Sequence, residues 1–154
     1  MKKEIRTAIY DSDLSIEAFR FEGFEKPFPN HFHDYYVVGY MESGKRNLTC
    51  QNRKYQVFEG NILLFNPGDS HGCVQTGNEP LDYRGLNISS KVMMDLAEEI
   101  TGKRILPVFS QSVIQDDEIS SVLRQLHHLI SEDLDLCEKE QQTEKQKQHL
   151  FFFA

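Results

Sequence analysis

The sequence has 154 residues, with 17 Lys and Arg against 24 Asp and Glu, and a formal net charge of −7. This length fits one domain with an appended helical arm, and the charge balance argues against DNA binding by this chain taken alone. No apolar run is long enough to cross a bilayer, and no apolar segment follows the basic N-terminus as a secretion signal requires. Three widely spaced cysteines, Cys50, Cys73 and Cys137, favour the reducing cytoplasm over a disulfide framework.

Residues 5–88 alternate between short segments rich in aromatic and β-branched residues and turns rich in Gly, Asn and Pro. This texture predicts many short antiparallel strands in a sandwich or small barrel. Gly39, inside one of them, predicts a bend or a close approach of two backbones. The predicted strands are Thr7–Tyr10, Ile16–Phe21, Tyr35–Met41, Arg46–Cys50, Tyr55–Phe58, Ile62–Phe65, Gly72–Gln75 and Tyr83–Ile88.

The periodicity changes after Ile88. Ser89 and Ser90 are candidate N-caps for a helix over about 90–101, and Gly102 is a natural stop. An extended segment is predicted around Pro107. We therefore place a barrel at residues 1–110 and a helical arm at residues 111–154.

A second helix is predicted to begin at Asp116–Glu118, where negative charge favours a helix start. Its apolar stripe is wider than a coiled-coil seam, so the barrel covers all of it or one edge pairs with a second copy of the chain. We predict a homodimer, and we interpret His127 and His128 as surface or interface residues. The expected interface residues are Leu123, Leu126, Leu129 and Ile130.

The C-terminal segment is charged or amide-rich from Glu138 to Gln148 and then ends in Phe151–Phe153. Three aromatic residues are costly to expose. Either the segment folds back onto the barrel or a partner, or the natural chain continues past Ala154 into another domain, which is our expectation. His149 is assigned no role.

Three histidines carry the functional argument. His31 and His33 lie two residues apart, so in an extended chain they project to the same side. The Asn66–Asp69 turn then delivers His71 onto a neighbouring strand. Three imidazoles that converge inside a barrel suit a metal ion or hydrogen bonds to a polar ligand; the alternative is satisfied histidines at a barrel mouth.

The His-x-His before a Tyr-rich strand, and the segment from Gly60 to His71 with its Asn-Pro-Gly-Asp turn, resemble the two halves of the cupin motif. Within that superfamily, residues 5–88 resemble the N-terminal ligand-binding domain of AraC-type transcription regulators. The resemblance implies an all-β double-stranded β-helix, a jelly-roll barrel, followed by C-terminal α-helices. It also implies a sensor that is not an enzyme, with a helix-turn-helix DNA-binding domain in a part of the protein beyond this chain. A sugar or another small metabolite would contact His31, His33, Tyr35, Val37 and His71.

In metal-dependent cupins a Glu four residues after the second His is a ligand, and this sequence has Val37 there. We therefore expect no cofactor, no metal and no catalytic residue. Were a metal bound, its ligands would be His31, His33 and His71, with Cys73 as a soft fourth ligand. A metal-dependent cupin enzyme, such as an isomerase or dioxygenase, and a non-sensing dimerisation module remain the alternatives.

Overall fold

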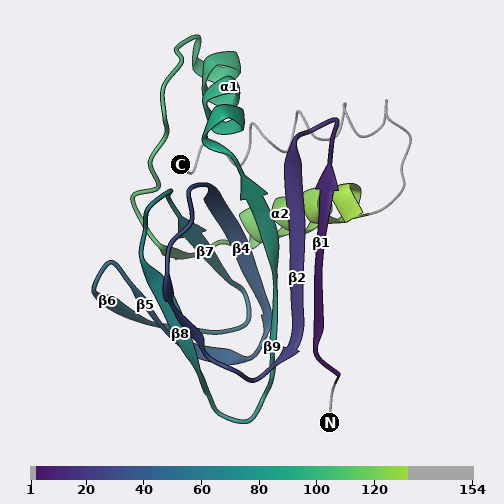
Figure 1. Cartoon of the computed structure of the whole chain (residues 1–154), viewed down its shortest axis with the longest axis vertical. Helices are drawn as coiled ribbons and strands as arrows, with labels where there is room; N and C mark the ends of the chain where they lie inside the picture. Colours follow the sequence, from purple (N-terminus) through teal and green to yellow (C-terminus); the bar gives the residue numbers. More distant parts are fainter. Residues whose placement is uncertain (1–2, 132–154) are drawn as a thin grey trace.

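The computed structural model describes residues 3–131, which fold into strands and two helices (Figure 1). One helix lies between the last two strands, and the other follows the last strand. The helices are α1 (Ser90–Thr101) and α2 (Asp117–Ser131). The strands are β1 (Ile5–Asp11), β2 (Ile16–Phe24), β3 (Phe28–His31), β4 (Tyr36–Ser43), β5 (Lys45–Cys50), β6 (Arg53–Val57), β7 (Asn61–Phe65), β8 (His71–Thr76), β9 (Leu81–Ile88) and β10 (Val113–Gln115).

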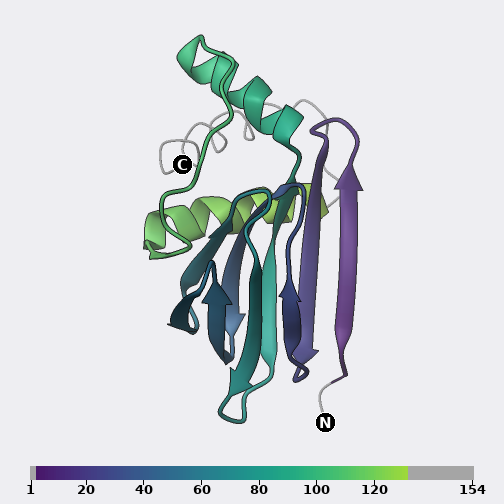
Figure 2. The ribbon, with the colours of Figure 1, turned by 60° about the vertical axis from the view of Figure 1, so that its left-hand side comes forward.

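The strands form two antiparallel sheets that face each other. The larger has the order β1-β2-β9-β4-β7-β10 and the smaller has the order β3-β8-β5-β6. One apolar cluster, which includes Phe19, Val37 and Leu48, takes residues from both sheets and fills the space between them. Helix α2 packs against the outer face of the larger sheet, where it contacts β1, β2 and β9, whereas α1 stands beyond the end of the strands (Figure 2).

Alternation along β4 decides which side chains face the barrel interior. Val37 and Met41 belong to the cluster between the sheets, whereas Tyr36, Val38 and Tyr40 belong to the cluster under the helices. This is the parity that the sequence predicts. A Cβ on Gly85, the partner of Gly39 on β9, would lie 2.6 Å from the Gly39 Cα, which confirms the close approach of two backbones expected at Gly39.

Helix α1 begins and ends where its capping residues predict. The Ser89 hydroxyl accepts a hydrogen bond from the backbone N–H of Val92, and Gly102 is left-handed with φ 77°. The segment around Pro107 is not a strand; the extended strand in this region is β10, which pairs with β7. The larger sheet therefore reaches residue 115, past the predicted end of the barrel. Strand β3 was not predicted, because its Pro29 weakens a strand signal.

The apolar stripe of α2 is buried within the chain, so the predicted dimer interface is wrong for these side chains. The exposed fractions of Leu123, Leu126, Leu129 and Ile130 are 0%, 1%, 3% and 3%. Leu123, Leu126 and Ile130 share one core cluster with the outer face of the larger sheet. The outward apolar residues of β2, β4 and β9 provide more surface for the helix than a small barrel was expected to offer.

His127 is also buried within the chain, whereas a surface or interface position was predicted for it. Its Nε2 lies 2.9 Å from the carbonyl oxygen of Phe19 on β2, which anchors α2 to the sheet. His128 is exposed. Cys137, His149 and Phe151–Phe153 lie outside the described residues. Within residues 3–131, neither helix has the length and apolarity that a bilayer-spanning helix needs.

Candidate functional site

A cavity of about 390 Å³ lies between the two sheets, inside the barrel. This volume is within the range of roughly 300–1,000 Å³ that is typical of small-molecule sites. All five predicted ligand-contact residues, His31, His33, Tyr35, Val37 and His71, contribute to its wall. The structure therefore brings the predicted set together around one space.

The three imidazoles form one cluster at an end of this cavity. Ring centroids are 4.5 Å apart for His31 and His71, 4.8 Å for His31 and His33, and 5.3 Å for His33 and His71. His31 and His71 are opposite each other in the pairing of β3 with β8, while His33 follows β3 and stacks on Tyr35 at 4.7 Å. Sheet pairing and the short His31–His33 spacing together produce the convergence.

The Asn66–Asp69 turn positions this cluster. A carboxylate oxygen of Asp69 accepts hydrogen bonds from the backbone N–H and side-chain amide of Asn66, at 2.9 and 3.1 Å. The backbone N–H of Gly68, whose φ is 85°, donates to the carbonyl of His33 at 2.8 Å. The turn thus joins the segment that carries His33 to the strand that carries His71.

Backbone contacts select one tautomer for two of the imidazoles. Nδ1 of His31 lies 2.6 Å from the carbonyl oxygen of Pro29, and Nδ1 of His71 lies 2.8 Å from that of Asp69. A carbonyl oxygen only accepts, so in each neutral ring Nδ1 carries the proton and donates. Nε2 of His31 and of His71 is then left with a lone pair.

Burial keeps two of the three imidazoles, His33 and His71, neutral. It lowers the pKa of His71 to about 4, with a further lowering from His31 and His33 and an opposing effect of the Asp69 carbonyl. Burial, and then the neighbouring His31, also lower the pKa of His33. At neutral pH both rings are therefore uncharged and can accept a hydrogen bond from a hydroxyl, an amine or another donor.

The cluster fits a metal only in part. Its three imidazoles offer ligand atoms that all lie within 4.8 Å of one another, and three His ligands are a donor set that zinc accepts. Within residues 3–131 the cluster contains no carboxylate, and Val37 supplies only an apolar wall. Cys73 is outside the cluster, with its Sγ 3.8 Å from Nη1 of Arg46.

Six polar residues of the cavity wall were not predicted from the sequence: Arg6, Thr7, Glu17, Arg46, Tyr83 and Asn87. Glu17 accepts a 2.8 Å hydrogen bond from the Asn87 side chain, and Arg46 is 1% exposed. A signal for Arg46 existed, because Arg46, Leu48 and Cys50 alternate along one strand and must share a face.

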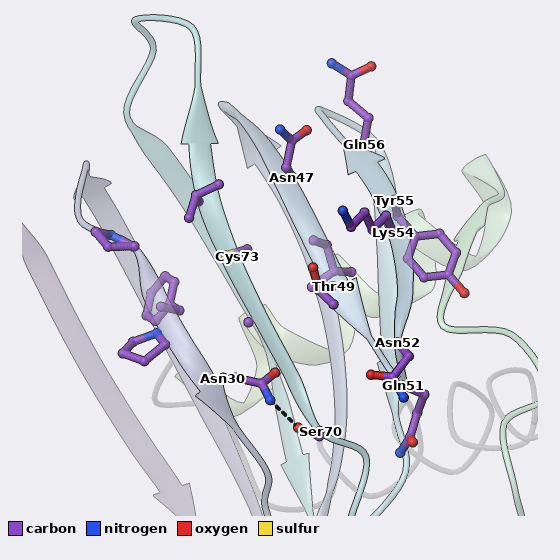
Figure 3. Close-up of a pocket in the computed structure, with 16 residues that line it drawn as sticks. Asn30, Asn47, Thr49, Gln51, Asn52, Lys54, Tyr55, Gln56, Ser70 and Cys73 are labelled. Atoms are coloured by element: carbon purple, nitrogen blue, oxygen red, sulfur yellow. Dashed lines mark hydrogen bonds between the residues drawn. The ribbon is translucent and has the colours of Figure 1, made fainter.

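A second, shallower hollow of about 820 Å³ lies on the opposite face of the smaller sheet (Figure 3). Its labelled polar side chains, among them Asn30, Asn47 and Thr49, come from β3, β5, β6 and the turns beside them. These three residues are exposed, and the amide of Asn30 donates to the Ser70 hydroxyl at 2.7 Å. The hollow has a polar, solvated lining, in contrast to the aromatic-lined barrel cavity.

Comparison with solved structures supports the fold. Apo ToxT K231A from Vibrio cholerae superposes with a TM-score of 0.62 at 15% identity, over 90% of this chain and 54% of that one. An RmlC-like cupin protein with a double-stranded β-helix fold from Methanocaldococcus jannaschii gives a TM-score of 0.50 at 14% identity, over 58% of this chain and 83% of that one. The barrel is thus a cupin double-stranded β-helix.

Comparison of sequences identifies the family. An uncharacterized HTH-type transcriptional regulator of Bacillus subtilis, YbfI, is 47% identical over 141 residues, which are 92% of this chain and 51% of that protein. The chain therefore spans about half the length of this relative. The family model described as AraC-like ligand binding domain matches residues 14–150. From its sequence and its fold, the chain belongs to the family of AraC-like ligand-binding domains.

Proposed function

We propose that this chain is the effector-sensing part of a transcription regulator and binds a small metabolite in the barrel cavity. The observation that carries the proposal is the convergence of His31, His33 and His71 on a cavity that aromatic side chains also line. Neutral imidazoles orient a polar ligand through hydrogen bonds, and the apolar wall contributes affinity by removing the ligand from water. DNA binding would belong to another domain, as in an HTH-type relative.

The larger sheet supplies a route from the cavity to the helices. Val37 faces the cavity, whereas its neighbour Val38 packs in the cluster that includes residues of α1 and α2. A ligand that binds one arrangement of this sheet more tightly than another shifts the helices with it, and that difference in affinity is the free energy of the switch. A homodimer stays a prediction, and it would use a surface other than the buried face of α2.

The histidine cluster also favours a second candidate, a metal-dependent cupin enzyme. Against it stands the apolar Val37 at the position of the expected carboxylate. The two candidates differ in whether the purified chain holds a metal, which is a direct measurement.

The sensing proposal is tested by thermal denaturation of the 154-residue chain with monosaccharides, amino acids and small organic acids. A ligand at 100 times its Kd stabilises by about 2.7 kcal/mol, which raises the Tm by about 5–10 °C for a chain of this size. His33→Ala should abolish the shift. Phe32→Ala is the matched control, because Phe32 is 68% exposed and does not line the cavity. No shift with any of the three classes, or a shift that His33→Ala leaves unchanged, would contradict the proposal.

A further inference from the structure

Arg46 is a buried cation at the end of the cavity opposite the histidines. It is 1% exposed, and its Nη1 and Nη2 donate to the carbonyl oxygens of Lys26 and Phe24 at 2.7 and 3.1 Å. Its guanidinium carbon lies 5.4 Å from the ring centroid of Phe28. None of the ion pairs formed within residues 3–131 includes Arg46.

In this arrangement the positive charge of Arg46 is not neutralised, and some of its N–H groups have no acceptor. Two backbone carbonyls accept hydrogen bonds but do not neutralise the cation, and burial of an uncompensated charge is strongly unfavourable. Nε of Arg46 is buried with no partner, and Nη2 has one acceptor for its two hydrogens. Nε and Nη2 form one edge of the guanidinium, and such an edge binds the two oxygens of a carboxylate side by side.

A second unpaired donor lies in the same half of the cavity. The Tyr83 hydroxyl is buried without a hydrogen-bond partner, and burial raises the pKa of this phenol far above its usual range. The phenol therefore keeps its proton and can donate. In the strand pairing of the larger sheet, Tyr83 lies opposite Phe21 on β2 and Met41 on β4. These neighbours make this part of the cavity wall apolar and aromatic.

Strand register sets the distance between the two ends. Cys73, whose Sγ contacts the Arg46 guanidinium, follows His71 by two residues along β8, which is about 7 Å at roughly 3.4 Å per residue. At the histidine end, Glu17 adds a carboxylate that pairs with Asn87. A second negative charge on a ligand would be repelled there, whereas a hydroxyl or amine would find acceptors.

We propose that the cavity takes an organic monocarboxylate with an aromatic or branched apolar body, whose carboxylate binds the free edge of the Arg46 guanidinium. The proposal rests on the cavity being the effector site, and it names the chemical class of the effector. Phe21, Phe28 and Tyr83 enclose the apolar body, and the histidine cluster receives any donor group at its far end.

The test uses matched pairs of carboxylates and carboxamides, which have nearly the same shape and differ in charge. Benzoate and benzamide, phenylacetate and phenylacetamide, and isovalerate and isovaleramide are titrated into the 154-residue chain by calorimetry. At least one carboxylate should bind tenfold or more tightly than its amide. Arg46→Lys, which keeps the charge and loses the two-donor edge, should weaken that carboxylate at least tenfold and leave its amide within twofold.

Arg53→Lys, at an exposed position on β6, is the matched control and should leave all affinities unchanged. Should Arg46→Lys fail to fold, as its circular dichroism would show, Tyr83→Phe gives the second readout, because it removes only the hydroxyl and should weaken the carboxylate threefold or more. The carboxylate proposal is overturned if no carboxylate exceeds its amide, or if both variants bind it as the wild type does. Binding of a neutral sugar with unchanged affinity in the Arg46 and Tyr83 variants would overturn it while the sensing proposal survives.

Discussion

The imidazole of His71 stacks on the ring of Phe65, with centroids 3.9 Å apart and planes 8° from parallel. The same imidazole is held at its edge by the carbonyl of Asp69, 2.8 Å from Nδ1. One contact fixes the plane of the ring and the other fixes its rotation within that plane. His71 therefore presents Nε2 to the cavity before any ligand arrives, which lowers the ordering cost of binding.

The first prediction is that His71 is a neutral Nδ1–H tautomer at pH 7, and that the neutral form of His31 also carries its proton on Nδ1. Each Nδ1 faces a carbonyl oxygen that can only accept, so the proton resides there. Long-range ¹H–¹⁵N correlation spectra of histidine-labelled protein distinguish the two tautomers. Signals of an Nε2–H tautomer at His71 would contradict the geometry of the site.

The second prediction concerns metal. Purified wild-type chain should hold well under one equivalent of zinc or iron by elemental analysis, because Val37 offers no ligand atom. Val37→Glu places a carboxylate in the cavity wall and should raise the zinc content toward one equivalent. Adding His71→Ala to that variant should remove the gain. Stoichiometric metal in the wild type, lost in His71→Ala, would revive the enzyme alternative.

The third prediction is that Leu126→Glu unfolds the chain without acting on any dimer. Leu126 is 1% exposed, and loss of its packing together with burial of a carboxylate should cost about 4 kcal/mol or more. Urea denaturation measures this free energy of unfolding. Gln125→Glu is the matched control, since it adds the same charge at an exposed neighbouring position and should change stability by less than about 0.5 kcal/mol. A folded Leu126→Glu chain of halved mass would restore the dimer interface predicted from the sequence.

The fourth prediction is a pH dependence of stability that comes from His127. Burial, opposed by the hydrogen bond to Phe19, lowers the pKa of His127, and Arg84, Arg20 and His128 lower it further. The unfolded chain therefore takes up this proton at a higher pH than the folded chain does. The stability contribution is complete above about pH 6.5 and is lost as the pH falls toward the folded pKa, with a slope of up to about 1.4 kcal/mol per pH unit.

His127→Gln retains a donor for the Phe19 carbonyl and does not titrate. Urea denaturation at pH 7 and pH 5 should show a smaller loss of stability in this variant than in the wild type. Equal losses in the two proteins would assign the acid sensitivity to other groups. His128→Gln, at an exposed position, is the control and should behave as the wild type does.

Structural features that depend on neighbouring residues could be predicted from the sequence. Features that depend on contacts between distant residues could not. The Ser89 and Gly102 caps act within one helix turn, so the bounds of α1 could be predicted. The amphipathic stripe of α2 showed that one face is buried, but not whether a sheet or a second chain buries it. The segment before β10 depends on hydrogen bonds between Asn66 and Phe109, which are 43 residues apart and leave no local pattern.

The same distinction between local and long-range signals applies to the residues of the candidate site. The spacing of His31 and His33 and the turn before His71 predicted the histidine end of the cavity. Arg46 and Tyr83 at the other end were missed, although strand alternation placed Arg46 among inward residues. Their unpaired donors become visible only when the residues around them are known, because a polar side chain in a strand is usually interpreted as solvent-exposed.

The central claim, that the effector occupies the barrel cavity, is tested most directly by intermolecular nuclear Overhauser effects. The chain is labelled at its Val and Leu methyl groups and saturated with whichever small organic acid binds. The methyl groups of Val37, Leu48 and Leu63 line the cavity, whereas Val38 and Leu64 lie on the other face of the same strands and serve as internal controls. The account predicts contacts from the ligand to the first group alone; contacts to Val38 and Leu64, or to the exposed Val74 on the hollow of Figure 3, would contradict it.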